Sequence, residues 1–352
     1  MLASCKVCIV DWNGCFVMDA GLQALLEKFI ELGGISENIC QRDGEFGRGV
    51  FPVDSTRKVK IMTPRNLLVD SNNLSVHGGE IVIKDKTSYS IDEIVFLESY
   101  YNDYSWGNNG NSDAAAFLKY VASLSEPIKK QLLDYGFVDV NFLNTAEYDD
   151  CLLKRFVSER AVTFDNRSVL APVWEFVNHS SFVPPLRVTP HGVETPPISP
   201  GPGEILFKYS GKNSSMSMWK KYGFACSCIV SYSIPFTLAI ENHSTQIRCS
   251  GQLGLDPNEL HNFSIQGNNI SIKSLPVGCI SASLPFENFQ SKLLSFGLST
   301  ALAKILFQQI LELNIKARHY MLESLQEFGA GGGAELFKAL TYETELIQRS
   351  LS

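Results

Sequence analysis

The stretch from residue 171 to residue 224 constrains the fold more than any other part of the chain. An apolar run ends there in Asn178-His179, and a segment dense in proline and glycine follows. Asn and His side chains both donate and accept hydrogen bonds, and a buried polar group left unpaired costs about 1–3 kcal/mol. The apolar run predicts a short buried strand. The Asn-His pair must therefore bind either the chain itself or a ligand.

Two tyrosines follow at the ends of predicted elements. Tyr209 closes a second predicted strand, residues 204–209, and Tyr222 stands directly before Gly223. Two phenols in such positions are suited to line a narrow channel with a polar tip. A tyrosine taken alone more often anchors the end of a strand, so the ordered combination carries the interpretation.

The composition excludes several classes of function. The chain has 352 residues, 45% of them hydrophobic, which is enough for a buried core and suggests about two domains. Its net charge is −7, and it has no basic stripe of the kind that binds phosphate backbones, so we expect no direct nucleic-acid partner. No apolar run approaches ~18 residues, which argues against a membrane span. The N-terminal residues lack a signal-peptide pattern, so we expect an intracellular protein, cytoplasmic or alternatively nuclear.

The nine cysteines are scattered and odd in number, which is typical of reduced intracellular thiols. Cys5 and Cys8 have the spacing of zinc ligands, but no second pair lies at finger distance. Cys226 and Cys228 have no third cysteine near them in sequence. We therefore predict no metal.

The remaining chain alternates between strand and helix patterns. Helical periodicity predicts a helix over residues 20–34 that Gly33-Gly34 terminates, and strands are expected at 57–70 and 79–86. A helical block covers about 92–155, with a loop of helix breakers at 106–111. Residues 182–203 predict an extended loop with a hairpin in which His191 is exposed. Strands follow Phe224, and helices follow residue 285, with a break at 329–333.

Four short segments in order carry a resemblance to a known family. Gly47-Arg48-Gly49, Asn178-His179-Ser180, Gly203-Glu204 with Tyr209, and Tyr222-Gly223-Phe224 resemble the signature of SET-domain methyltransferases. More narrowly, they resemble the branch typified by the Rubisco large-subunit lysine methyltransferases. The resemblance covers roughly residues 20–225.

The resemblance implies an α+β fold. A SET domain, made of small sheets with a pseudoknot, would occupy residues 1–255 and carry the helical insert at about 92–155. A mostly helical module at 256–352 would then help to recruit the substrate. From the sequence alone, those helices are equally suited to covering a sheet edge.

The resemblance also implies methyl transfer from S-adenosylmethionine to a lysine of a protein substrate. In this interpretation Tyr222 orients the acceptor amine and stabilises the transferring methyl group through CH···O contacts, and Tyr209 forms the opposite wall. The residues that would hold the cofactor are Arg48, Gly49, Arg160, Asn178, His179 and Tyr222.

The match is partial around Arg160, and alternatives remain open. The family has an Arg-Ser-Arg-Ala-Phe-like segment there. In this chain the serine is either displaced to Ser158 or replaced by Glu159, and Val162 stands where an aromatic residue is usual. Glu175 stands three positions before Asn178, as glutamate in place of the family's aspartate. A SET-like scaffold without activity, a protein-histidine methyltransferase and a protein with coincidental motifs are the alternatives. No G-x-S-x-G elbow or phosphate-binding P-loop supports a hydrolase or an NTPase.

Overall fold

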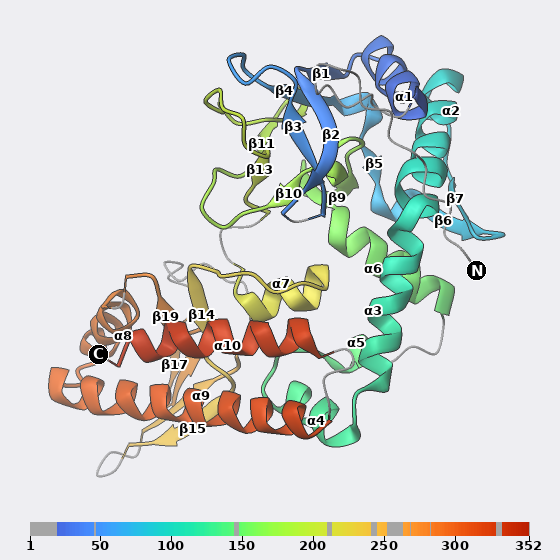
Figure 1. Ribbon diagram of the computed structural model, residues 1–352. Helices are drawn as coiled ribbons and strands as arrows, with labels where there is room; N and C mark the ends of the chain where they lie inside the picture. The colour runs from blue at the N-terminus through green and yellow to red at the C-terminus, as the bar shows by residue number, and fades with distance from the viewer. Residues whose placement is uncertain are drawn as a thin grey trace. The chain divides into compact units, whose positions relative to one another are not determined.

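The computed structural model divides the chain into two compact units (Figure 1). It describes residues 20–45, 47–143, 148–209, 213–240, 245–251, 263–267, 269–281, 283–328 and 333–351. Unit 1 consists of Met1–Ala115 and Glu147–Gly211, and unit 2 of Ala116–Ala146 and Lys212–Ser352. The Cys5-x-x-Cys8 pair lies outside the described residues. No helix among the described residues is long and apolar enough to cross a membrane.

Unit 1 begins with helix α1, Ala20–Glu31. Leucine and phenylalanine side chains at helical spacing turn one face of α1 inward, and Phe29 is fully buried. Gly33, at φ +91°, ends the helix, and the Gly34 N–H donates to the carbonyl of Phe29. The predicted helix and its glycine stop are confirmed.

All the strands of unit 1 form small sheets. The largest has the order β1-β4-β12-β11, and the others pair two or three strands each. The predicted 57–70 strand is broken, because a 3-10 turn, Arg65–Leu67, follows Pro64. The hairpin expected within 182–203 is present as β11 and β12, and His191 in its turn is exposed. The strands are β1 Ile35–Glu37, β2 Ile39–Gly44, β3 Gly47–Pro52, β4 Lys60–Pro64, β5 Val69–Asp70, β6 Leu74–His77, β7 Glu80–Ile83, β8 Val162–Phe164, β9 Arg167–Leu170, β10 Asn178–His179, β11 Arg187–Thr189, β12 Gly192–Glu194 and β13 Leu206–Phe207.

The helical block contains one segment that the sequence did not predict. Residues 106–111 were expected to form a loop, but an unbroken π-helix, η3, covers Tyr100–Gly110. Trp106 donates from Nε1 to the carbonyl of Gly79 at 2.7 Å, and Asn102 pairs with the backbone of Ile81. These contacts outweigh the low helix propensity of the Gly and Asn residues. The flanking helices of the block are α2 Ile91–Ser99, α3 Asn111–Ser123, α4 Glu126–Asp134, α5 Val140–Leu143 and α6 Tyr148–Arg160.

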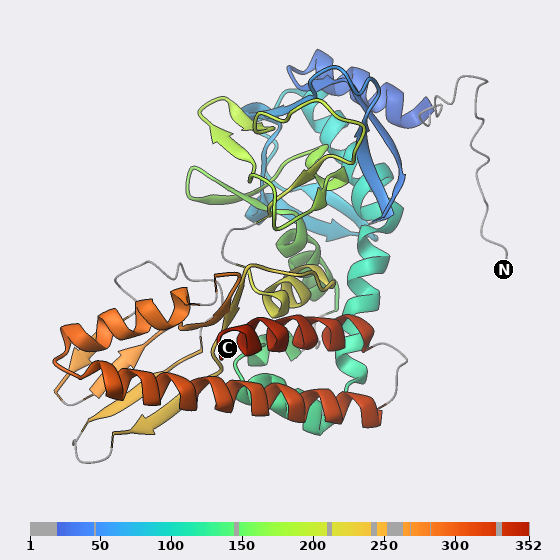
Figure 2. The same ribbon diagram turned by 60° about the vertical axis from the view of Figure 1, so that its left-hand side comes forward.

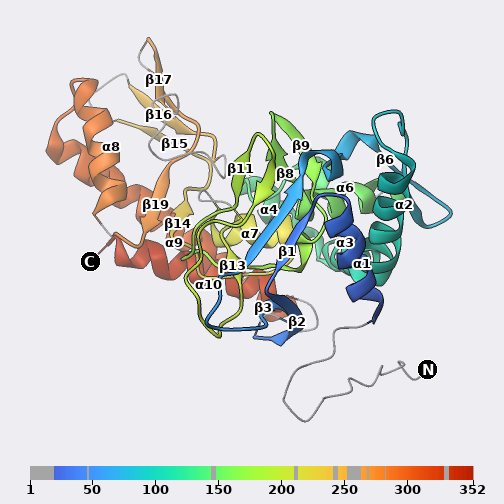
Figure 3. The same ribbon diagram turned by 90° about the horizontal axis from the view of Figure 1, so that it is seen from above.

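Unit 2 combines two sheets with long helices (Figures 2 and 3). Strands β14 and β19 pair antiparallel, and a second sheet has the order β15-β16-β18-β17. Helices α9 and α10 run side by side in Figures 1 and 2. The elements are α7 Ser215–Tyr222, β14 Val230–Tyr232, β15 Phe236–Ala239, β16 Gln246–Cys249, β17 Phe263–Gln266, β18 Asn269–Ile272, β19 Pro276–Cys279, α8 Leu284–Ser295, α9 Thr300–Phe328 and α10 Ala334–Arg349.

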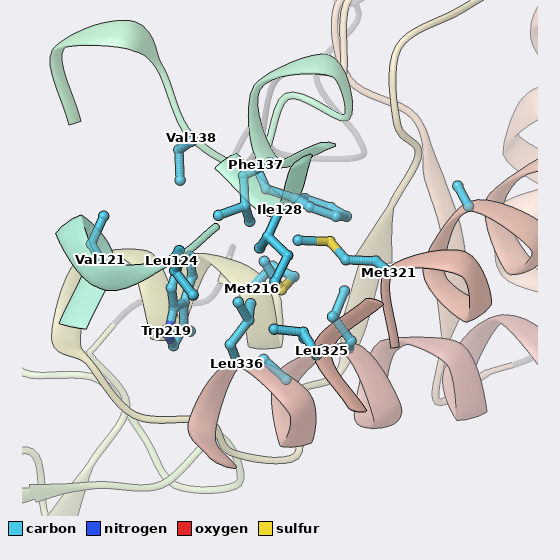
Figure 4. Packing of buried hydrophobic residues seen from close by; sticks show 14 of the residues in the cluster. Val121, Leu124, Ile128, Phe137, Val138, Met216, Trp219, Met321, Leu325 and Leu336 are labelled. Atoms are coloured by element: carbon cyan, nitrogen blue, oxygen red, sulfur yellow. The ribbon is translucent and has the colours of Figure 1, made fainter. Parts of the chain in front are cut away.

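The core of unit 2 draws on three separate parts of the chain (Figure 4). Ile128 and Phe137 come from the helical insert, Trp219 from α7, and Met321 and Leu336 from α9 and α10. All five side chains are buried, and burying one such side chain contributes about 1.5–3 kcal/mol. Residues 116–146 therefore belong with the C-terminal helices in packing.

The fold class is confirmed: the chain is α+β, with small sheets, a helical insert and a helical C-terminal region. The compact units, however, do not divide at residue 255. Strands β14 to β19 pack with the C-terminal helices in one unit, and so does the second half of the insert. Packing joins these segments although they are far apart in sequence.

Candidate active site

The centre of the candidate site in unit 1 is the pairing of β10 with β13. The two strands run parallel, with Asn178 opposite Leu206 and His179 opposite Phe207. The expected strand over the preceding apolar run is wrong. Val173 has φ +76°, and a 3-10 turn, Trp174–Phe176, follows it, so the chain changes direction just before Asn178.

Asn178 joins three segments of the chain. Its Nδ2 donates to the carbonyl oxygen of Arg48 at 3.2 Å and to Oε1 of Glu204 at 2.6 Å. The bond to Glu204 is charge-assisted, which is the stronger kind. Both amide hydrogens of Asn178 are therefore used within the protein.

Gly49 allows this close approach. A Cβ added to Gly49 would lie 2.0 Å from Oε1 of Glu204 and 3.0 Å from Nδ2 of Asn178. The family resemblance placed Gly49 among the residues that would hold the cofactor. In this structure the space beside Gly49 holds the carboxylate of Glu204.

His179 is buried and oriented from both ring nitrogens. Its Nδ1 accepts from the backbone N–H of Tyr209 at 3.1 Å, and its Nε2 lies 3.2 Å from Oγ of Ser181. Because Nδ1 accepts, the neutral ring carries its proton on Nε2. The His179 side chain thus links the ends of β10 and β13, in addition to the backbone hydrogen bonds between the two strands.

Tyr209 is held by its hydroxyl. The hydroxyl donates to the carbonyl of Val177 at 2.7 Å, and the ring centroid lies 4.9 Å from that of His179. Burial raises the pKa of Tyr209, so the phenol stays neutral at physiological pH. The positive charge of Arg160 lowers this pKa, and the negative charges of Glu204 and Glu175 raise it.

Arg160 lies between two carboxylates at the end of α6. Its Nε donates to Glu175 at 3.0 Å and its NH1 to Glu159 at 2.8 Å, while the guanidinium stacks over Phe156. Burial lowers the pKa of Arg160, but Glu175 and Glu159 outweigh it and raise the pKa overall. Burial raises the pKa of Glu175, whose Oε2 also accepts from Ser105.

The structure brings most of the predicted site residues together in unit 1. Arg48, Gly49 and Asn178 meet at one point, and His179 contacts Tyr209. Tyr222 belongs to unit 2, where it ends α7 before Gly223 at φ +80°. The hydrogen bonds of the candidate site therefore all lie within unit 1.

Sequence reasoning missed two partners in this site. Glu204 was noted as part of a motif, but its bond to Asn178 was not foreseen. Ser181, two positions after His179, was not singled out either. A polar residue spaced two positions from a buried histidine was the only available signal for Ser181, and it is a weak one.

Comparison with known proteins gives structural neighbours and no sequence relatives. No protein-family model matches the chain, and no curated protein matches it. A solved structure of the SET domain of LSMT bound to lysine and AdoHcy is 14% identical over 95% of this chain and 91% of that chain, with a TM-score of 0.46. A structure of Rubisco LSMT bound to AdoMet is 13% identical over 95% and 91% of the two chains, with a TM-score of 0.42.

Proposed function

We propose that this chain is an S-adenosylmethionine-dependent protein methyltransferase that modifies a lysine side chain. One observation carries the proposal. Three segments that the sequence singled out separately, at Arg48-Gly49, Asn178-His179 and Glu204, meet through the side chain of Asn178. Coincidental motifs would have no reason to converge on one amide group.

The polar groups of the candidate site in unit 1 suit a cationic cofactor. S-adenosylmethionine carries a sulfonium and an ammonium group, and it supplies an activated methyl group. The carboxylate of Glu204 lies beside Asn178 and offers a complementary negative charge. The backbone at Arg48 and Gly49, with Asn178 and His179, would hold the cofactor, and Arg160 would assist them.

In this proposal the phenols act on the acceptor. A lysine has an unperturbed pKa of about 10.4 and must lose its proton before it attacks. An apolar channel beside a cationic cofactor lowers that pKa. Tyr209 donates its hydrogen to the carbonyl of Val177, so its oxygen keeps lone pairs that can accept weak CH···O contacts. That Tyr222 orients the acceptor amine stays a prediction from the sequence.

A second candidate is a SET-like scaffold without activity. The observation that favours it is the position of Arg160 between Glu159 and Glu175, which neutralises the guanidinium within the protein. A cofactor carboxylate would have to compete with both glutamates for this cation.

Calorimetric titration with S-adenosylmethionine tests the proposal. We expect micromolar binding to the wild-type chain and a loss of at least about tenfold, or 1.4 kcal/mol, in Asn178→Ala. His191→Ala is the matched control, because it changes an exposed side chain of the same unit and should leave affinity unchanged.

The absence of binding by a folded wild-type chain would leave the scaffold candidate. If binding is present, labelled methyl transfer followed by mass analysis of the product identifies the modified residue. A methylhistidine product would contradict the lysine assignment.

A further inference from the structure

Two thiols lie side by side in the segment that connects α7 to β14. The Sγ atoms of Cys226 and Cys228 are 3.6 Å apart, and both residues are reduced. A disulfide bond is about 2 Å long, so the sulfurs need to approach by roughly 1.6 Å. Only Ser227 separates the two residues along the chain.

The two sulfurs differ in accessibility. Cys226 is half-buried, whereas Cys228 is buried with an exposed fraction of 1%. An oxidant from solvent therefore reaches Cys226 first. A second thiol within contact distance is the usual arrangement of a resolving cysteine.

We propose that Cys226 and Cys228 form a reversible disulfide with a small-molecule disulfide as the oxidant. The Cys226 thiolate attacks one sulfur of the oxidant, which forms a mixed disulfide and releases one thiol. The Cys228 thiolate then attacks the Cys226 sulfur and displaces the second thiol. The two protein thiols give two electrons to the oxidant, whose S–S bond breaks, and their two protons pass through solvent to the two thiolates that leave, which become two thiols.

The backbone permits this closure. Residues 224–228 form no helix or strand, so the disulfide breaks no ladder or helical hydrogen bond. The segment is nevertheless fixed within unit 2. Ser215 donates from Oγ to the carbonyl of Cys226 at 2.7 Å, and the Ala225 N–H donates to Glu335 at 2.8 Å. These bonds hold Cys226 near the buried Cys228 instead of letting the thiols separate.

Peptide mapping of the full chain tests the inference, because trypsin isolates this pair. Cleavage after Lys221 and Arg248 gives a peptide, 222–248, that contains Cys226 and Cys228 and no other cysteine. The folded protein is treated with oxidised glutathione, quenched with iodoacetamide and digested. We expect most of this peptide to be unalkylated and two hydrogen atoms lighter than the reduced form, and dithiothreitol to restore two alkylated thiols.

Two variants assign the roles of the sulfurs. In Cys228→Ser, the Cys226 mixed disulfide cannot be resolved, so the peptide should retain glutathione. Cys151→Ser is the matched control, since Cys151 is half-buried on α6 and its loss should leave the disulfide yield unchanged. A doubly alkylated wild-type peptide after oxidation would overturn the inference, as would lasting glutathione on it or a bond to another cysteine.

Discussion

At the scale of single residues, Gly49 is the position where one added methyl group changes the site most. A Cβ there would overlap the Glu204 carboxylate and force it away from Asn178. We expect Gly49→Ala to remove that bond and to lower the free energy of unfolding by about 1–2 kcal/mol, since hydrogen bonds to charged groups contribute about 1.5–3 kcal/mol and this one is only partly buried. Chemical denaturation measures the change.

Gly47→Ala separates this contact effect from backbone strain. Gly47 has φ +85° and nothing within 4 Å of its would-be Cβ, so alanine there costs only about 1–2 kcal/mol of conformational strain. In a Glu204→Ala background the Gly49→Ala effect should shrink, whereas the Gly47→Ala effect should persist. Equal effects of Gly49→Ala in both backgrounds would contradict the contact explanation.

At the scale of elements, the π-helix η3 depends on side chains that bond to its neighbour β7. The Oδ1 of Asn102 accepts from the Ile81 N–H at 2.8 Å, and its Nδ2 donates to the Ile81 carbonyl at 3.0 Å. Asn102→Ala leaves both backbone groups without these partners, at a cost of about 1–3 kcal/mol. We expect faster amide exchange over η3 and β7, measured by hydrogen–deuterium exchange.

Asp103→Ala provides the control within the same helix, because Asp103 is exposed. It should leave exchange in β7 at the wild-type rate. If Asn102→Ala accelerated exchange equally throughout unit 1, the helix would not depend on this local bond.

At the scale of the molecule, one buried carboxylate connects four elements of unit 2. Glu343 on α10 accepts from Arg318 of α9 at 2.7 Å, from Ser231 of β14 at 3.2 Å and from the Met216 N–H of α7 at 2.9 Å. Both charged side chains are fully buried. Glu343→Gln leaves Arg318 as an unpaired buried cation, and we expect unit 2 to lose about 3–5 kcal/mol of stability.

Scanning calorimetry with hydrogen exchange over α7, α9 and β14 checks this expectation. Glu345→Gln removes a carboxylate from the exposed face of the same helix and should change stability by no more than about 0.5 kcal/mol. Adding Arg318→Met to Glu343→Gln should recover part of the loss, because no charge then remains buried alone. A further loss in the double variant would contradict the argument.

Local sequence patterns predicted most elements of the fold. Helix α1 with its glycine stop, the hairpin of β11 and β12 and the C-terminal helices all follow from periodicity and turn residues. The η3 segment could not be predicted, because its stability comes from contacts with Gly79 and Ile81 that override propensity. The reversal at Val173 was also missed, since a positive φ at a β-branched residue depends on its surroundings.

For the candidate site, the sequence identified residues but not all of their bonds. The Asn178-His179 pair was expected to bind either the chain or a ligand, and both residues are hydrogen-bonded within the chain. Which partner each residue would take depends on the pairing of β10 with β13, which no local pattern specifies. The hydrogen bond between Asn178 and Glu204 could not be predicted for this reason.

The interleaving of the two units affects how the chain is made. Strand β4 completes its sheet only when Glu194 arrives opposite Met62, and residues 116–146 pack with helices that are synthesised last. Synthesis adds about 5–20 residues per second, so the partners of the first strands are made on the order of ten seconds later. During that interval the apolar faces of both incomplete units stay exposed, for longer than they would in a chain whose domains are sequential.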